Sequence, residues 1–137
     1  MTAFALDARI EADSVELFDL RLCTCRLARD GRWPWLILVP KRAGLVELSD
    51  LTPPERVAVM DDIADATSVL QRRFTPTKVN VAAIGNMVRQ LHIHVAARTE
   101  GDAGWPGPIW GHGKAEPRDE ATLQALAADL RTEWKNL

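Results

Sequence analysis

The sequence has little cysteine, little histidine and no long hydrophobic run, and each scarcity excludes a class of protein. No apolar stretch among the 137 residues approaches the roughly 18 that a membrane-spanning helix needs. The first residues, MTAFALDARIEADS, include acidic side chains and lack a cationic region followed by an apolar one, so we expect no secretion signal. The sequence therefore favours a cytoplasmic location and no membrane partner.

A strong net charge is also absent. The formal net charge is −2, and Lys and Arg never form a block longer than two residues. Proteins that bind long nucleic acids mainly through electrostatics carry a basic patch or stripe. We therefore expect no polymeric nucleic acid as a partner, and any bound phosphate must be held by local hydrogen-bond donors.

The only two cysteines, Cys23 and Cys25, are two residues apart in the run LCTCRL, so on a strand they would share one face. Such a pair is compatible with a redox site or with half of a metal site. A tetrahedral zinc site of this kind usually needs a second Cys pair, which the chain lacks. We therefore predict that both are small, buried, apolar side chains.

Apolar patterning predicts five strands. Two of them flank a turn at Asp30-Gly31 and form a hairpin, which Pro40 ends because proline has no N–H for the ladder. Two more flank a turn at Gly85-Asn86. The predicted strands cover residues 14–20, 21–28, 34–42, 77–85 and 88–98.

Two helices are expected, over residues 50–74 and 118–137. Thr52, Pro53 and Glu55 form a capping box with proline at the first helical position. The apolar stripe of the first helix would be Val57, Met60, Ile63, Ala64, Thr67, Leu70 and Phe74, with the acidic residues mostly off it; that of the second would be Leu123, Leu126, Leu130 and Trp134. The order of elements predicts one α+β domain over residues 1–137, with helices against one face of an antiparallel sheet.

Chemistry is indicated by Gln90, His92 and His94, which alternate with apolar residues and would share one face of the last strand. Nothing in sheet packing requires these three residue types, although a lone strand histidine is often only a hydrogen-bonded part of the structure. A metal site would need a third ligand, and His112 is the only other imidazole. Catalysis without a metal needs less, because one neutral imidazole can attack phosphorus while a second donates hydrogen bonds.

The run from Gly85 to Arg98, GNMVRQLHIHVAAR, resembles the motif of the histidine-triad (HIT) family, in which three histidines alternate with apolar residues after a Gly-polar turn. The run LILVPKRAGLVELSDLTPPE resembles the family's strand that ends in proline and leads into a capped helix. The resemblance covers roughly residues 14–110. It implies a HIT-like fold, with a sheet of about five strands and two helices, and a two-fold homodimer.

The resemblance also implies an activity, namely metal-independent hydrolysis of a nucleoside phosphoramidate or a dinucleoside polyphosphate, with no cofactor. His92 would be the nucleophile of a nucleotidyl-histidine intermediate, oriented by a main-chain carbonyl. His94 would contact phosphate oxygens and assist the leaving group, and Asn86 would contact phosphate. The substrate would thus be a small molecule of the nucleotide type.

Gln90 departs from the family motif, because it occupies the position of the first histidine and cannot titrate. We expect the chemistry to survive, since the nucleophile position is intact. Three alternatives remain open: a nucleotide-binding module with weak or no turnover, a nucleotidyltransferase, and a metal-dependent His-x-His site. The transferase branch of the family carries its glutamine at the third position, so this sequence fits it less well.

The family's nucleoside slot is built by the hairpin that ends in Pro40, so we expect Leu27, Asp30 and Trp35 to bind the nucleoside, with Trp33 and Leu36 as further candidates. Asp30 would accept hydrogen bonds from ribose hydroxyls, or else be only a turn residue. The tryptophans could equally belong to the core or to a dimer surface. The long loop with Trp105, Trp110 and His112 either covers the site or is pinned to the domain.

Overall fold

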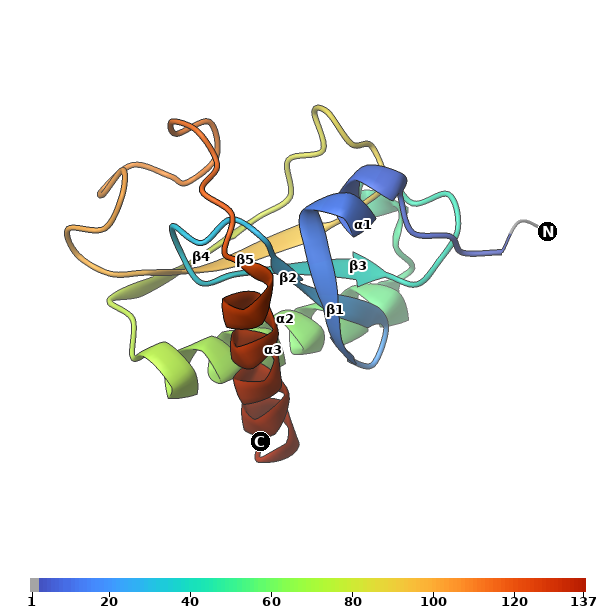
Figure 1. Ribbon diagram of the computed structural model, residues 1–137. Helices are drawn as coiled ribbons and strands as arrows, with labels where there is room; N and C mark the ends of the chain where they lie inside the picture. Colours follow the sequence, from blue (N-terminus) through green and yellow to red (C-terminus); the bar gives the residue numbers. More distant parts are fainter. Residues whose placement is uncertain (1–2) are drawn as a thin grey trace.

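The computed structural model describes residues 3–137 as a five-stranded antiparallel sheet with helices on both faces. The strands are β1 Ser14–Asp19, β2 Cys23–Ala28, β3 Trp35–Pro40, β4 Lys78–Ala82 and β5 Ile93–Arg98, in the spatial order β1-β2-β3-β5-β4. The helices are α1 Ala8–Asp13, the 3-10 turn η1 Leu48–Asp50, α2 Pro53–Phe74 and α3 Glu120–Lys135. In Figure 1 the two long helices lie below the sheet and α1 lies above it. The predicted α+β class and antiparallel sheet are confirmed.

The hairpin expected at Asp30-Gly31 is present as β2 and β3, which pair from Cys23↔Pro40 to Leu27↔Leu36. The last strand begins later than predicted, at Ile93 instead of near residue 88. Its ladder with β3 ends at Leu38↔Ile93. Two residues earlier, the Leu91 amide donates to the Leu45 carbonyl of a loop, at 3.0 Å. The segment 83–92 therefore lies outside the sheet, and His92 is its last residue before β5.

The main core lies between the sheet and the long helices. Cys23 and Cys25 point into it and are free thiols with no exposed area. Burial raises the pKa of both thiols above its ordinary value, so they stay protonated and unreactive. The prediction that they are small buried apolar side chains is confirmed.

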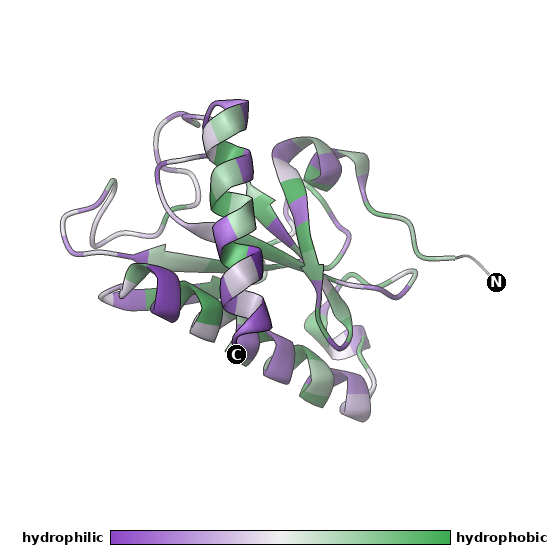
Figure 2. Ribbon diagram, turned by 60° about the horizontal axis from the view of Figure 1, so that its bottom comes forward, coloured by the Kyte–Doolittle hydropathy of each residue, from purple (hydrophilic) through white to green (hydrophobic). Residues whose placement is uncertain are grey.

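Helix α2 begins as the sequence predicts, with the reciprocal capping box of Thr52 and Glu55 and with proline at its first turn. Its predicted apolar stripe is only partly correct, because Leu70 is buried and Ile63 and Phe74 pack against the core, but other members are exposed. The buried residues are Val59, Asp62, Ala66, Val69 and Leu70. Val57 and Met60 are instead 63% and 58% exposed. Apolar residues occur on both the buried and the exposed side of this helix, along which green and purple bands alternate in Figure 2, and the periodicity alone selected a stripe that lies only partly in the core.

Asp62 on α2 is fully buried although the sequence placed it off the core stripe. Its carboxylate accepts hydrogen bonds from the main-chain amides of Arg21, Leu22 and Cys23, at 2.9 to 3.0 Å. The Arg21 and Leu22 amides belong to the turn between β1 and β2, and Cys23 is the first residue of β2. Asp62 therefore joins that turn to the middle of α2.

Helix α3 agrees with the prediction. Asp119 caps it, Leu123 and Leu130 are buried, and Trp134 stacks on Phe18 with ring centroids 4.8 Å apart. Among residues 3–137, no helix combines the length and the apolar character needed to cross a membrane.

The long loop between β5 and α3 is anchored by Arg98, whose side chain is 1% exposed. Its guanidinium donates to the Asp102 carboxylate at 2.7 and 3.0 Å and to the Gly107 carbonyl at 2.7 Å. Arg98 is thus buried with its donors satisfied, as a buried charge requires, and its partner Asp102 is partly exposed. The loop is thereby held over the face of the sheet that lies opposite the long helices.

Candidate active site

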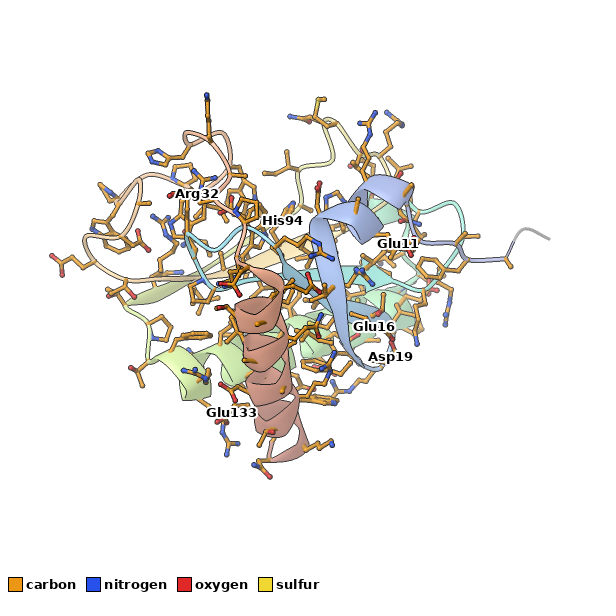
Figure 3. All side chains as sticks on the ribbon, viewed as in Figure 1. Glu11, Glu16, Asp19, Arg32, His94 and Glu133 are labelled. Carbon is orange, nitrogen blue, oxygen red and sulfur yellow. The ribbon has the colours of Figure 1, made fainter. Side chains whose placement is uncertain are left out.

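The imidazoles of His92 and His94 lie side by side on the face of the sheet away from α2 and α3. Their ring centroids are 4.8 Å apart, and the two residues are 8% and 7% exposed. In Figure 3 His94 lies above the strands near Arg32, far from Glu133 at the lower end of α3. The alternation that we read from the sequence therefore holds for the two histidines, although only His94 belongs to β5.

Each imidazole has one nitrogen fixed by a neighbour, and the two neighbours have opposite character. His92 Nδ1 is 2.7 Å from the main-chain carbonyl of Gln90, which can only accept. His94 Nδ1 is 3.0 Å from the indole Nε1 of Trp35, which can only donate. Neutral His92 therefore carries its proton on Nδ1 and has a free lone pair on Nε2. Neutral His94 carries its proton on Nε2, as a hydrogen-bond donor.

His94 is held in its neutral form. Burial, together with the nearby His92, lowers the pKa of His94 to about 4 from an ordinary value of 6.5. The Trp35 indole and the Trp110 ring lie against it, each with a centroid 5.5 Å away. At neutral pH the pair therefore offers one nucleophilic nitrogen and one N–H donor without a fixed positive charge on His94.

Acid is expected to destabilise the fold before His94 is protonated in the native state. Between the unfolded pKa near 6.5 and the folded pKa near 4, the unfolded chain binds a proton that the folded chain does not. As the pH is lowered through this window, the free energy of unfolding should therefore decrease, and His94 should account for up to about 3 kcal/mol of the decrease. Urea denaturation between pH 7 and pH 4.5 measures the slope, which should be shallower for His94→Gln. Equal slopes for the two proteins would contradict the assignment.

Two cavities meet at His92, which lines both. The first, of about 370 Å³, also contains His94 and has mainly apolar walls; we call it the apolar cavity. Its other lining residues are Arg9, Ile10, Asp13, Ala28, Arg29, Asp30, Trp35, Ile37, Val88, Trp110, Ala115 and Pro117. Its size and composition suit a flat heterocycle with a few polar groups at its edge.

The second cavity, of about 540 Å³, is more polar, and we call it the polar cavity. It lies between the η1 region and the segment 83–92. Asn86, Arg89 and Gln90 line it together with His92, and Glu47 and Ser49 line its opposite side. Gly85, which precedes Asn86, has a φ of +68°, a conformation that glycine adopts without strain.

Some of the predicted site residues come together and others do not. Trp35 and Asp30 line the apolar cavity, and Asn86 and Gln90 line the polar one. Leu27 does not reach either cavity: it has no exposed area and lies in the main core, because its side chain points to the helix face of β2. Leu36 lies in the same core, and Trp33 is buried against Ala96 and Ile109 on the other face.

The Asp30 carboxylate is occupied by contacts within its own hairpin and with the loop that precedes α3. Its carboxylate accepts from the Arg32 guanidinium, at 2.7 Å from Nη2, and from the Arg32 and Glu116 amides at 3.2 and 3.4 Å. Burial acts to raise the pKa of Asp30, but these hydrogen bonds outweigh it and leave the pKa lowered. The contacts are those of a turn residue, and contact with ribose stays a prediction.

Two parts of the cavity walls were missed or left open by sequence reasoning. Helix α1 contributes Arg9, Ile10 and Asp13, but a six-residue helix with a single buried apolar residue has no periodicity to detect. Asp7 as an N-cap was the one available signal. Trp110 of the long loop lines the apolar cavity, whereas the His112 ring lies against Trp33, at 6.2 Å between centroids.

The part of the chain that the structure describes, residues 3–137, holds no group of three or more His, Cys, Asp or Glu side chains that could bind a metal ion. The pair His92 and His94 thus lacks a third protein ligand of the usual kinds within those residues.

Comparison with solved structures identifies close relatives. A histidine-triad protein from Sinorhizobium meliloti 1021 is 45% identical, with a TM-score of 0.91 over 95% of this chain and 96% of that one. Histidine-triad proteins from Bradyrhizobium japonicum and Marinobacter aquaeolei VT8 are each 36% identical. Their TM-scores are 0.92 and 0.94, over 96% and 99% of this chain and 98% and 99% of theirs. No curated protein matches the sequence.

The family model of the HIT domain matches residues 9–101, which is more than half of the chain and includes both His92 and His94. The match to the family model and the similarity of the whole fold to histidine-triad proteins both agree with the motif around His92. The chain therefore belongs to the histidine-triad (HIT) family.

Proposed function

We propose that the protein hydrolyses a nucleoside phosphoramidate or a dinucleoside polyphosphate through a nucleotidyl intermediate on His92. The observation that carries this proposal is the pair of opposite tautomers. His92 presents a lone pair at Nε2 because its Nδ1–H donates to the Gln90 carbonyl, and His94 presents an Nε2–H because the Trp35 indole N–H donates to its Nδ1. A nucleophile next to a neutral donor is what attack on a phosphate ester or amidate needs.

The reaction has two displacements. In the first, the Nε2 lone pair of His92 forms a bond to phosphorus, the bond from phosphorus to the leaving nitrogen or oxygen breaks, and the leaving group keeps the electron pair. His94 donates a hydrogen bond to a phosphate oxygen or to the departing atom. In the second, water attacks phosphorus, the N–P pair returns to His92, and the protons of that water end on the products or in solvent.

The two cavities suit the two halves of such a substrate. The apolar cavity would hold the nucleoside, and the polar cavity, with Asn86, would hold phosphate oxygens and the leaving group. The contact of Gln90 with His92 favours turnover over binding alone. It is made by the main-chain carbonyl of Gln90, which any residue at this position would supply. The side-chain change at this position therefore leaves the orientation of His92 intact.

The direct test is mass spectrometry, without acid, after brief exposure to a fluorogenic adenylyl phosphoramidate. We expect a nucleotidyl adduct that maps to His92, followed by release of AMP. Tight AMP binding without adduct or product would favour the binding-module alternative, and an adduct on another residue would overturn the assignment. Loss of activity with a chelator would favour the metal-dependent alternative.

The proposal for assembly is a two-fold homodimer built on α2 and β4. β4 is an edge strand, and a groove of about 510 Å³ between it and α2 is lined by Met60, Ile63, Val79 and Val81. Met60 and Val81 are 58% and 47% exposed. Unpaired edges and exposed apolar residues are features that proteins usually cover. Pairing with a second copy would cover both at once.

Light scattering of the purified protein is expected to give twice the chain mass of 15.2 kDa. Met60→Lys should shift the mass towards that of one chain, because the charge would be buried unpaired in the interface. Met87→Lys is the matched control, since Met87 is 81% exposed and lies outside the groove. A single-chain mass for the parent at all concentrations would refute the dimer.

A further inference from the structure

The side chain of Gln90 is engaged by the N-terminal segment, which we define as residues 4–13. Its Oε1 accepts from the Asp7 amide and its Nε2 donates to the Ala5 carbonyl, both at 2.8 Å. The carboxamide thus binds the segment as a peptide group of a neighbouring strand would. The main chain of Gln90, meanwhile, contacts His92.

The N-terminal segment forms one wall of the apolar cavity. Arg9, Ile10 and Asp13 line the cavity directly. Ile10 is 4% exposed and packs with Ile37 of β3, in a small cluster that Phe4, Leu6 and Val88 extend. Arg9 also donates to the Met87 carbonyl at 3.2 Å, which gives a second tie to the segment 83–92. In Figure 1 α1 and the segment 83–92 both lie above the sheet, opposite the long helices.

We propose that Gln90 is a positioning residue, whose side chain holds the N-terminal segment against the apolar cavity and so sets the affinity for the nucleoside. The inference rests on the proposed function in that the cavity is taken to bind a nucleoside. An amide presents its N–H and C=O side by side, whereas the two nitrogens of an imidazole point apart. A histidine at this position would not make both bonds, which is a physical reason for the departure from the triad.

Removal of the carboxamide in Gln90→Ala is expected to raise the dissociation constant for AMP about tenfold, the effect of losing two modest hydrogen bonds. KM for the phosphoramidate should rise by a similar factor, and kcat should fall by much less. Gln90→His should behave like Gln90→Ala. Gln124→Ala, on the outer face of α3, is the matched control and should resemble the parent. An unchanged AMP affinity in Gln90→Ala would overturn the proposal.

Amide hydrogen exchange tests the same contact without any activity. Peptides covering residues 3–13 should exchange at least about tenfold faster in Gln90→Ala than in the parent, because their ordering depends on the two bonds. Equal exchange would overturn the role of Gln90 whatever the enzyme does. If the parent neither binds AMP nor hydrolyses any adduct, the proposed function fails, and exchange alone then decides whether Gln90 holds the segment.

A matched pair of substitutions at Asp7 identifies the bond itself. Asp7 has a φ of −58°, which proline also adopts. Asp7→Pro therefore removes the main-chain N–H that donates to Gln90 Oε1 and leaves the φ angle unstrained. Asp7→Ala removes the cap of α1 but keeps the N–H. Gln90→Ala should cost more AMP affinity in the Asp7→Ala background than in the Asp7→Pro background, where only the bond to the Ala5 carbonyl is left to lose. Equal costs in both backgrounds would overturn the assigned contact.

Discussion

Replacing His92 with alanine is expected to lower the rate of AMP release from an adenylyl phosphoramidate by about 10⁴-fold or more, the scale seen when a nucleophile is removed. The loss should appear in kcat, since the substrate keeps its contacts with both cavities. His92 is the residue with an unprotonated Nε2 at the junction of those cavities, and His94 has the opposite tautomer and cannot replace it. The nucleotidyl adduct should vanish with the activity.

The control for this experiment is His112→Ala, which removes the third histidine of the chain. His112 lies against Trp33 and lines neither cavity, so its loss should change kcat by less than about threefold. AMP affinity of His92→Ala should stay within a few-fold of the parent, which shows that the pocket is intact. Turnover of His92→Ala at the parent rate would remove His92 from the mechanism.

Replacing Asp62 with alanine is expected to lower the free energy of unfolding by about 4 kcal/mol. The substitution leaves three amides, those of Arg21, Leu22 and Cys23, without the carboxylate that now accepts from them. Two of these bonds are buried, and an unsatisfied buried donor costs roughly 1–3 kcal/mol. Urea denaturation followed by circular dichroism measures the change.

Asp61→Ala provides the neighbouring control, because Asp61 is exposed one position away on the same helix. It should change stability by less than about 0.5 kcal/mol. Similar losses in both variants would mean that the effect comes from helix α2 in general. The effect would then not come from the connection between Asp62 and the turn.

Local signals in the sequence predicted the local structure well. The Thr52 cap, the hairpin turn at Asp30-Gly31 and the end of β3 at Pro40 depend on neighbours within a few residues, and all three are present. The buried face of α2 could not be predicted in this way. A helix with apolar residues on two faces does not say which one meets the sheet, and a buried aspartate looks like a surface residue until its partners 40 residues away are known.

In the candidate site, too, the residues set by local pattern were predicted and those set by distant parts of the chain were not. Alternation identified His92 and His94, and the carbonyl expected to orient His92 is that of Gln90. The partner of His94, Trp35, lies on another strand, and the wall formed by α1 comes from the other end of the sequence. The prediction that Leu27 lines the site fails because Leu27 shares the core face of β2 with Cys23 and Cys25, which alternation places on the same side of the strand.

The position of His92 between an apolar and a polar cavity has a consequence for the order in which products depart. In the proposed mechanism, a leaving group in the polar cavity would diffuse away while the nucleotidyl half is still covalently attached to His92 on the side of the apolar cavity. The vacated space then admits the water, or any competing acceptor, that ends the cycle. Steady-state kinetics with an added acceptor should therefore show the parallel lines of a ping-pong scheme.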